Sequence, residues 1–76
     1  MDLVFYSRKD CHLCEAFETE LNEFLDGHDL NSKKIDIDSR QELQLLYGND
    51  VPVLTFNNNI ICQHFFDKER ILEALP

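Results

Sequence analysis

Short apolar runs and turn-forming residues divide the chain into alternating strand and helix segments. Residues 2–6 contain a continuous apolar run with β-branched and aromatic members, which predicts a buried strand. Residues 31–37 end in an alternation of polar and apolar side chains, which predicts a strand with one buried face. Residues 50–56 and 60–62 predict two more strands, and the three asparagines between them tolerate positive φ and predict a hairpin turn.

Helical periodicity fills the intervals between these strands. The first helix is expected over residues 11–25, where apolar side chains recur at helical spacing, namely Cys14, Phe17, Leu21, Phe24 and Leu25. We expect Gly27 to take the left-handed conformation that ends a helix.

Two shorter helices are expected later in the chain. Asp38 or Ser39 is placed at the start of the first, because Ser39 and Glu42 fit the capping-box pattern, and Gly48 is placed at its end. The predicted inner face of this helix comprises Leu43, Leu46 and Tyr47. We expect Asp67 to cap the last helix, whose predicted buried side comprises Ile71, Leu72 and Leu75.

The order of elements is therefore β-α-β-α-β-β-α, which predicts an α/β fold. The first two strands should lie parallel and be joined by a right-handed crossover, and the last two should form an antiparallel hairpin. Helices covering both faces of a mixed four-stranded sheet would bury the apolar stripes. The 76 residues are expected to form one domain, since a chain this short has only one core to share.

The first predicted helix begins at a Cys-x-x-Cys pair, Cys11 and Cys14. A thiolate at a helix start is stabilised by free backbone N–H groups and the helix dipole, so we expect the pKa of Cys11 to lie below the ~8.5 of a free thiol. Arg8 and Lys9 add positive charge nearby. Cys14 lies on the apolar stripe within reach of Cys11 and should be the sheltered sulfur. This arrangement favours thiol–disulfide exchange, with Cys11 as nucleophile and Cys14 as resolving thiol.

Other uses of the cysteine pair fit the sequence less well. Haem attachment requires a histidine directly after the second cysteine, where this chain has Glu15. A zinc site would need a second ligand pair, for which only Cys62 and His64 remain, about fifty residues further on. We therefore expect neither a metal nor a bound cofactor. Cys62 is expected to be a small buried apolar side chain, with a second resolving thiol as the alternative.

Charge and composition restrict the partners. The chain carries 15 acidic and 7 basic residues, a net charge of -8, which disfavours nucleic acids and anionic membranes. No apolar stretch approaches the ~20 residues of a membrane span, and no signal-peptide pattern precedes the first strand. Three cysteines do not make a secreted disulfide framework. We expect a monomer in the reducing cytoplasm.

The chain resembles the glutaredoxin branch of the thioredoxin superfamily. The resemblance rests on Tyr6-Ser7-Arg8 leading into Cys11-His12-Leu13-Cys14, on Val51-Pro52 about forty residues later, and on the ending in a hairpin and a helix. It is similar above all to the small glutaredoxin-like proteins that carry Cys-His-Leu-Cys. It implies a thioredoxin-like fold and a thiol–disulfide oxidoreductase.

The resemblance also implies a partner site. Pro52 should be cis and face the cysteines, and Val51 should offer its backbone N–H and C=O to the bound thiol partner. Arg8 matches the basic residue that binds a glutathione carboxylate in the family. His12 is placed beside it, either as an exposed spacer or as a group that tunes the thiol. The implied partners are protein or small-molecule thiols and disulfides, with glutathione or a thioredoxin-type reductase as electron donor.

The chain departs from the glutaredoxin pattern after the hairpin. Cys62-Gln63 stands where the family has Gly-Gly, and His64-Phe65-Phe66 follows. We therefore expect poor use of glutathione. The Phe65-Phe66 segment, expected to be exposed, supports a second hypothesis, a non-enzymatic module that binds a partner or senses redox state. Thioredoxins, which belong to the same superfamily, carry a buried carboxylate that assists deprotonation of the second cysteine. Residues 3–6 offer none, so Glu15, His12 and water remain open for that role.

Overall fold

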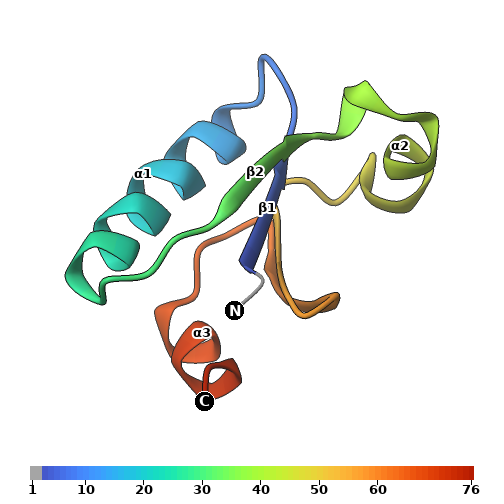
Figure 1. Cartoon of the computed structure of the whole chain (residues 1–76). Helices are drawn as coiled ribbons and strands as arrows, with labels where there is room; N and C mark the ends of the chain where they lie inside the picture. The colour runs from blue at the N-terminus through green and yellow to red at the C-terminus, as the bar shows by residue number, and fades with distance from the viewer. Residues whose placement is uncertain (1–2) are drawn as a thin grey trace.

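The central feature of the fold is a four-stranded mixed sheet in the order β2-β1-β3-β4 (Figure 1). The computed structural model describes residues 3–76, so Asp2, the predicted first residue of the first strand, lies outside the described residues. The elements are β1 (Leu3–Ser7), α1 (His12–Gly27), β2 (Lys33–Asp36), η1 (Ile37–Ser39), α2 (Gln41–Tyr47), β3 (Val53–Phe56), β4 (Asn59–Gln63) and α3 (Lys68–Ala74). The predicted α/β class and element order are confirmed, with the 3-10 turn η1 as an addition.

Strand pairing brings the ends of segments that are distant in the sequence together at one end of the sheet. β1 pairs in parallel with β2 and antiparallel with β3, while β3 and β4 form the predicted hairpin. In this register Tyr6 lies opposite Val53, and Ser7 lies opposite Asp36. The end of β1, the end of β2 and the start of β3 therefore meet where the chain enters α1.

The helices cover both faces of the sheet, as predicted. On one face Phe17 of α1 stacks on Phe5 with ring centroids 5.4 Å apart, and Ile71 of α3 belongs to the same buried cluster. On the other face Tyr6 contacts Tyr47 of α2, with centroids 4.6 Å apart. Alternate residues of the strand β1 thus pack against different helices, as the period of two requires.

The end of α1 differs from the prediction. Gly27 is the last helical residue and does not have positive φ; Asp29 takes the left-handed conformation instead, with φ 54°. The N–H of Leu30 donates to Leu25 O at 2.9 Å, and the N–H of Asp29 donates to Asp26 O at 3.5 Å, which is the Schellman pattern. A short polar aspartate tolerates this conformation, so the glycine is not needed there.

The helix α2 also starts and packs differently from the prediction. Arg40 is its N-cap without a side-chain hydrogen bond, whereas the Ser39 hydroxyl donates to Asp36 O at 2.6 Å, so the predicted capping box is wrong. Leu46 is exposed, because a helix of two turns buries only one narrow stripe, here led by Leu43. In α3 the Asp67 cap is confirmed by its hydrogen bond from Arg70 N, but Leu72 is exposed.

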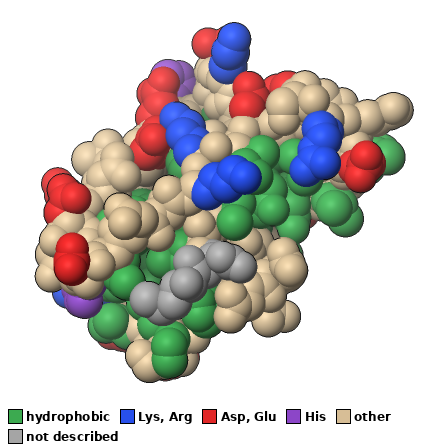
Figure 2. Space-filling view, viewed as in Figure 1, with side chains coloured by type: hydrophobic (Ala, Val, Ile, Leu, Met, Phe, Trp, Pro, Cys, Tyr) green, Lys and Arg blue, Asp and Glu red, His purple; other side chains and the backbone are tan. Residues whose placement is uncertain are grey.

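Several large apolar side chains reach the surface. On the face shown in Figure 2, hydrophobic side chains are visible between the sheet and α2, with lysine, arginine and carboxylate groups interspersed above them. The most exposed are Leu13, Leu45, Leu46, Ile60, Phe65 and Leu72. Among residues 3–76 there is no helix with the length and apolar character to cross a bilayer.

Candidate active site

Cys11 ends the loop after β1 and forms the N-cap of α1. Its backbone is extended (φ -116°, ψ 104°), and its Sγ accepts the N–H of Cys14 at 3.1 Å. Cys11 and Cys14 are joined in a disulfide, with their Cα atoms 5.2 Å apart. Cys14 is 4% exposed and Cys11 is half-buried, so the predicted burial of the second sulfur is confirmed. The sulfur that solvent reaches more easily is therefore the one at the helix start.

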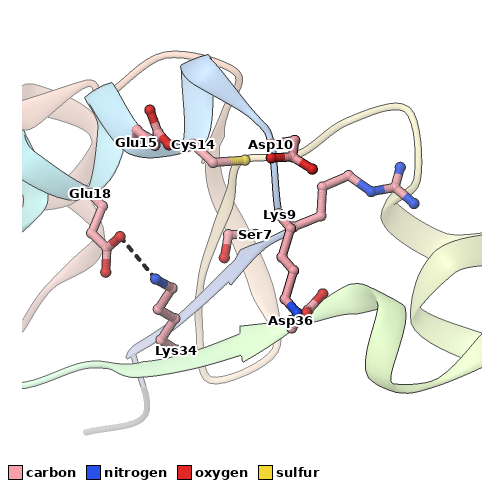
Figure 3. A pocket seen from close by; sticks show the side chains of 9 residues that line it. Ser7, Lys9, Asp10, Cys14, Glu15, Glu18, Lys34 and Asp36 are labelled. Carbon is pink, nitrogen blue, oxygen red and sulfur yellow. Dashed lines mark hydrogen bonds and ion pairs between the residues drawn. The ribbon is translucent and has the colours of Figure 1, made fainter.

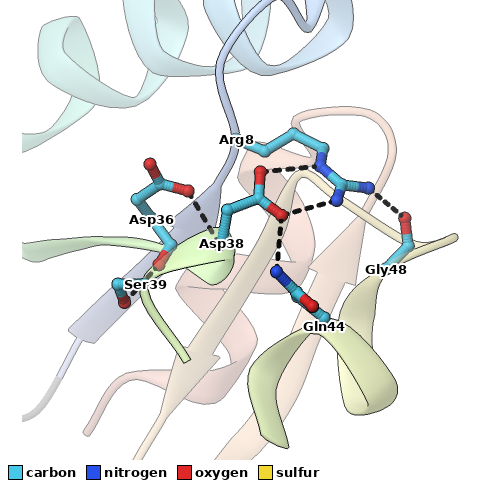
Figure 4. Close-up of polar contacts among 6 residues, drawn as sticks. All are labelled: Arg8, Asp36, Asp38, Ser39, Gln44 and Gly48. Atoms are coloured by element: carbon cyan, nitrogen blue, oxygen red, sulfur yellow. Dashed lines mark hydrogen bonds and ion pairs between the residues drawn. The ribbon is translucent and has the colours of Figure 1, made fainter. Parts of the chain in front are cut away.

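Arg8 connects the loop before Cys11 to Asp38 of η1, which precedes α2, and to Gly48, which directly follows α2 (Figure 4). Its Nε and Nη2 donate to the two carboxylate oxygens of Asp38 at 3.3 and 2.7 Å, and its Nη1 donates to Gly48 O at 3.0 Å. Gln44 Nε2 also donates to Asp38 Oδ1, at 3.1 Å. The hydrogen-bonded pair raises the pKa of Arg8 and lowers the pKa of the Asp38 carboxyl.

The Val51–Pro52 segment lies at the same end of the sheet as Cys11, directly before β3. The peptide bond between the two residues is cis, Pro52 is buried, and Pro52 O accepts the N–H of His64 at 2.8 Å. The N–H of Val51 donates to Tyr47 O at 3.2 Å. Of the two backbone groups that the resemblance assigns to a partner, the N–H is thus already bonded within the chain.

The segment after β4 places its unusual backbone at His64. Cys62 and Gln63 belong to the strand, whereas His64 has φ 69°, and the N–H of Phe65 donates to Gln63 O at 2.8 Å across it. This is a three-residue turn of the γ type. The His64 ring lies 3.4 Å from Asn49 O. The residue with the left-handed backbone is therefore one position later than the Cys62-Gln63 pair that replaces the family glycines.

The two aromatic residues of this segment have different environments. Phe65 is 69% exposed, but Phe66 is half-buried and packs edge-on against Phe17, with ring centroids 5.6 Å apart. The prediction of an exposed Phe65-Phe66 pair is therefore wrong for Phe66, because the ring completes the cluster beneath α1. A groove remains between the first turns of α1 and the segment after β4, lined by Leu13, Ala16, Phe17, Glu20, His64, Phe65 and Phe66.

A polar cleft lies on the other side of the cysteine pair (Figure 3), and the Cys14 sulfur points into it. Its lining comprises Ser7, Arg8, Lys9, Asp10, Cys14, Glu15, Glu18, Lys34 and Asp36. Of the proton acceptors left open by the sequence, Glu15 lines this cleft with Cys14, whereas His12 projects fully into solvent. Asp36 was missed because only the parallel pairing of Ser7 with Asp36 brings it here; its place at the end of a predicted strand was the available signal.

The third cysteine, Cys62, lies in the buried core and not in the pair at the start of α1. Cys62 is 3% exposed, and burial raises the pKa of its thiol, so the expectation of a buried apolar side chain is confirmed. Within residues 3–76, histidine, cysteine and carboxylate side chains do not gather in a group of three that would hold a metal ion.

The comparison with protein families agrees with this geometry. Residues 2–76 match the family described as Glutaredoxin-like domain (DUF836). The chain belongs to this glutaredoxin-like family. The resemblance stated from the cysteine motif and the Val51-Pro52 segment is thereby confirmed over nearly the whole chain.

Solved structures share the fold of this glutaredoxin-like domain. Protein Ne2328 from Nitrosomonas europaea, solved by solution NMR, is 34% identical, with a TM-score of 0.82 over 99% of this chain and 91% of that one. Thioredoxin 1 from Thermosipho africanus TCF52B is 14% identical, with a TM-score of 0.65 over 96% of this chain and 88% of that one. A mutant of the thioredoxin-like protein BC3987 is 19% identical, with a TM-score of 0.64 over 97% and 99%. None of the curated proteins matches the chain.

Proposed function

We propose that this glutaredoxin-like domain is a dithiol oxidoreductase in which Cys11 attacks a disulfide and Cys14 resolves the product. The observation that supports it most directly is the position of Cys11 as N-cap of α1, with the Cys14 N–H 3.1 Å from its sulfur. In the reduced protein that N–H and the helix dipole stabilise a thiolate more than a thiol. The sheltered Cys14 sulfur lies within bonding reach.

The exchange proceeds in two balanced steps. The Cys11 thiolate attacks one sulfur of the partner disulfide, so that a mixed disulfide forms and the second partner sulfur leaves as a thiolate. Cys14 loses its proton into the polar cleft that its side chain lines, where Glu15 and solvent are the acceptors. The Cys14 thiolate then attacks Cys11 Sγ, and the partner sulfur that was bound to Cys11 in the mixed disulfide leaves as a thiolate. Two electrons have passed to the partner, and the Cys11–Cys14 disulfide is formed.

Regeneration requires an external donor, which we propose to be a dithiol or a thioredoxin-type reductase in the cytoplasm. Glutathione is proposed to be a poor donor. The segment that would carry its carboxylate contacts is a γ-turn centred on His64, and Phe65 makes the adjacent surface apolar. A Cβ at this left-handed position fills space that a glycine would leave open to a ligand.

A second candidate is a non-enzymatic module that docks on a partner. The exposed side chains of Phe65 and Leu13 favour it, since both line the groove between α1 and the segment after β4. The two candidates differ in turnover: a docking module would bind its partner equally well after Cys11 is replaced.

The test is reduction of a protein disulfide by the pre-reduced domain, compared with variants in each of which one cysteine is replaced. Cys11→Ser is expected to abolish the reaction, and Cys14→Ser to stop it at a mixed disulfide that mass spectrometry detects as a covalent adduct. Cys62→Ala removes a cysteine that lies outside the pair and is the control. Reduction that persists in Cys11→Ser, or an adduct formed through Cys62, would refute the proposed roles.

A further inference from the structure

The cation next to the cysteine pair is already neutralised by a carboxylate of the same chain. We propose that Asp38, by occupying the Arg8 guanidinium, selects against disulfides that carry a carboxylate beside the reacting sulfur. The preferred partners are then disulfides that are neutral or cationic at that position. This inference rests on the proposed oxidoreductase function and names the substrate class of that same site.

Geometry supports the occupation of Arg8. An arginine side chain has five N–H donors, arranged so that one edge accepts a carboxylate in bidentate fashion. Asp38 takes that edge through Nε and Nη2, and Gly48 O takes a donor of Nη1. Gln44 holds the carboxylate from the other side. An incoming carboxylate would have to compete with one that is tethered to the fold and oriented by a second donor.

Without Asp38, Arg8 would be available to a substrate carboxylate near the cysteine pair. It lies three positions before Cys11 in the loop that leaves β1. Its acceptor Gly48 lies at the end of α2, close in sequence to the cis Val51–Pro52 segment. The planar guanidinium matches a carboxylate in bidentate geometry, so without Asp38 it would attract an anionic ligand at this position.

The other nearby cation does not replace Arg8. Lys9 is exposed and lines the polar cleft together with the carboxylates of Asp10 and Asp36 (Figure 3). Asp36 pairs with Ser7 in the sheet, so the pairing of β1 with β2 holds the Asp36 charge at the end of the strands where Arg8 follows. Removal of the Asp38 charge alone should therefore make the electrostatic potential that a substrate meets at Arg8 more positive.

The experiment measures how fast the pre-reduced domain is oxidised by small symmetrical disulfides of different charge. The probes are dithiodipropionate, which is anionic, bis(2-hydroxyethyl) disulfide, which is neutral, and cystamine, which is cationic. In Asp38→Asn the ratio of the anionic to the neutral rate constant should rise about tenfold, because the freed guanidinium can make charge-assisted hydrogen bonds to a substrate carboxylate. The ratio of the cationic to the neutral rate constant should fall, and added salt should reduce both changes.

Two further variants distinguish selection by substrate charge at Arg8 from the effect of the protein's net charge. Asp26→Asn makes the same change in net charge at the far end of α1, on an exposed residue, and should leave both ratios within about twofold of the wild type. The double variant Arg8→Gln/Asp38→Asn removes both charges and should return the ratios to about the wild-type values. This variant also tests the proposal if Asp38→Asn alone is poorly folded.

The results that overturn the proposal are distinct from those that overturn the function. If Asp38→Asn changes all three rate constants by one common factor, Asp38 has only a structural role. If the double variant loses anionic reactivity about tenfold relative to the wild type, Arg8 already serves anions and is not blocked. If the wild-type domain reacts with none of the disulfides faster than a free thiol does, the oxidoreductase function itself fails.

Discussion

Cys11 has a structural role that can be separated from its chemistry. As the N-cap of α1 it accepts the N–H of Cys14, which would otherwise lack a partner in the first helical turn. Serine is a strong N-cap and alanine is a poor one, and exchanging them at such a position costs about 1 kcal/mol. For a domain of this size 1 kcal/mol corresponds to about 4–8 °C in Tm.

We therefore expect Cys11→Ser to melt about 4–8 °C above Cys11→Ala. Both variants lack the disulfide, so the comparison isolates the cap. At Cys14, inside the helix and 4% exposed, the order should reverse: alanine is favoured over serine by about 0.5 kcal/mol of helix propensity, and it buries no hydroxyl.

The assay is thermal denaturation of the four variants under reducing conditions, followed by circular dichroism at one protein concentration. Opposite orders at the two positions would show that Cys11 caps the helix and that Cys14 packs within it. Equal Tm values for Cys11→Ser and Cys11→Ala would refute the capping role, and with it the N–H that stabilises the thiolate in the proposed mechanism.

Three further predictions concern packing, reactivity and pH. Phe17→Ala should cost about 3–5 kcal/mol in chemical denaturation, because the ring is 2% exposed, whereas Phe65→Ala, on an exposed ring, should change stability by no more than about 0.5 kcal/mol. Cys62, buried and with a raised pKa, should resist iodoacetamide in the native protein and react only in denaturant; native labelling as fast as that of Cys11 would contradict this. The folded pKa of Asp38 lies below the ordinary 3.8, so its contribution to stability is present above that pH and is lost as the pH falls through the lower value. The Tm difference between wild type and Asp38→Asn should therefore shrink in acid, and a constant difference from pH 7 to pH 3 would contradict the ion pair.

Local patterns were sufficient to predict the elements and the place of the Cys11–Cys14 pair at the start of α1. The stripe from Cys14 to Leu25 is a property of neighbours three and four positions apart, and so it can be read from the chain alone. The same holds for the Asp67 cap and for the asparagine turn, where Asn57 and Asn58 have positive φ. Helix ends were less predictable: Gly48 ends α2 as expected, but the left-handed conformation predicted for Gly27 lies at Asp29.

The surroundings of the cysteines depended on contacts between distant segments. Asp38 is 30 positions from Arg8 and Gly48 is 40 positions away, and no periodicity relates such residues. Their meeting follows from the parallel pairing of β1 with β2 and from the return of the chain through α2. The burial of Phe66 likewise depends on its packing against Phe17 and Phe24 of α1, which are distant in the sequence, and not on the residues next to it in the chain. The sequence by itself determined where the cysteine pair lies, because motif and helix start are local. The pairing of Arg8 with Asp38 beside it was decided by tertiary structure, because only the fold brings these two side chains within hydrogen-bond distance.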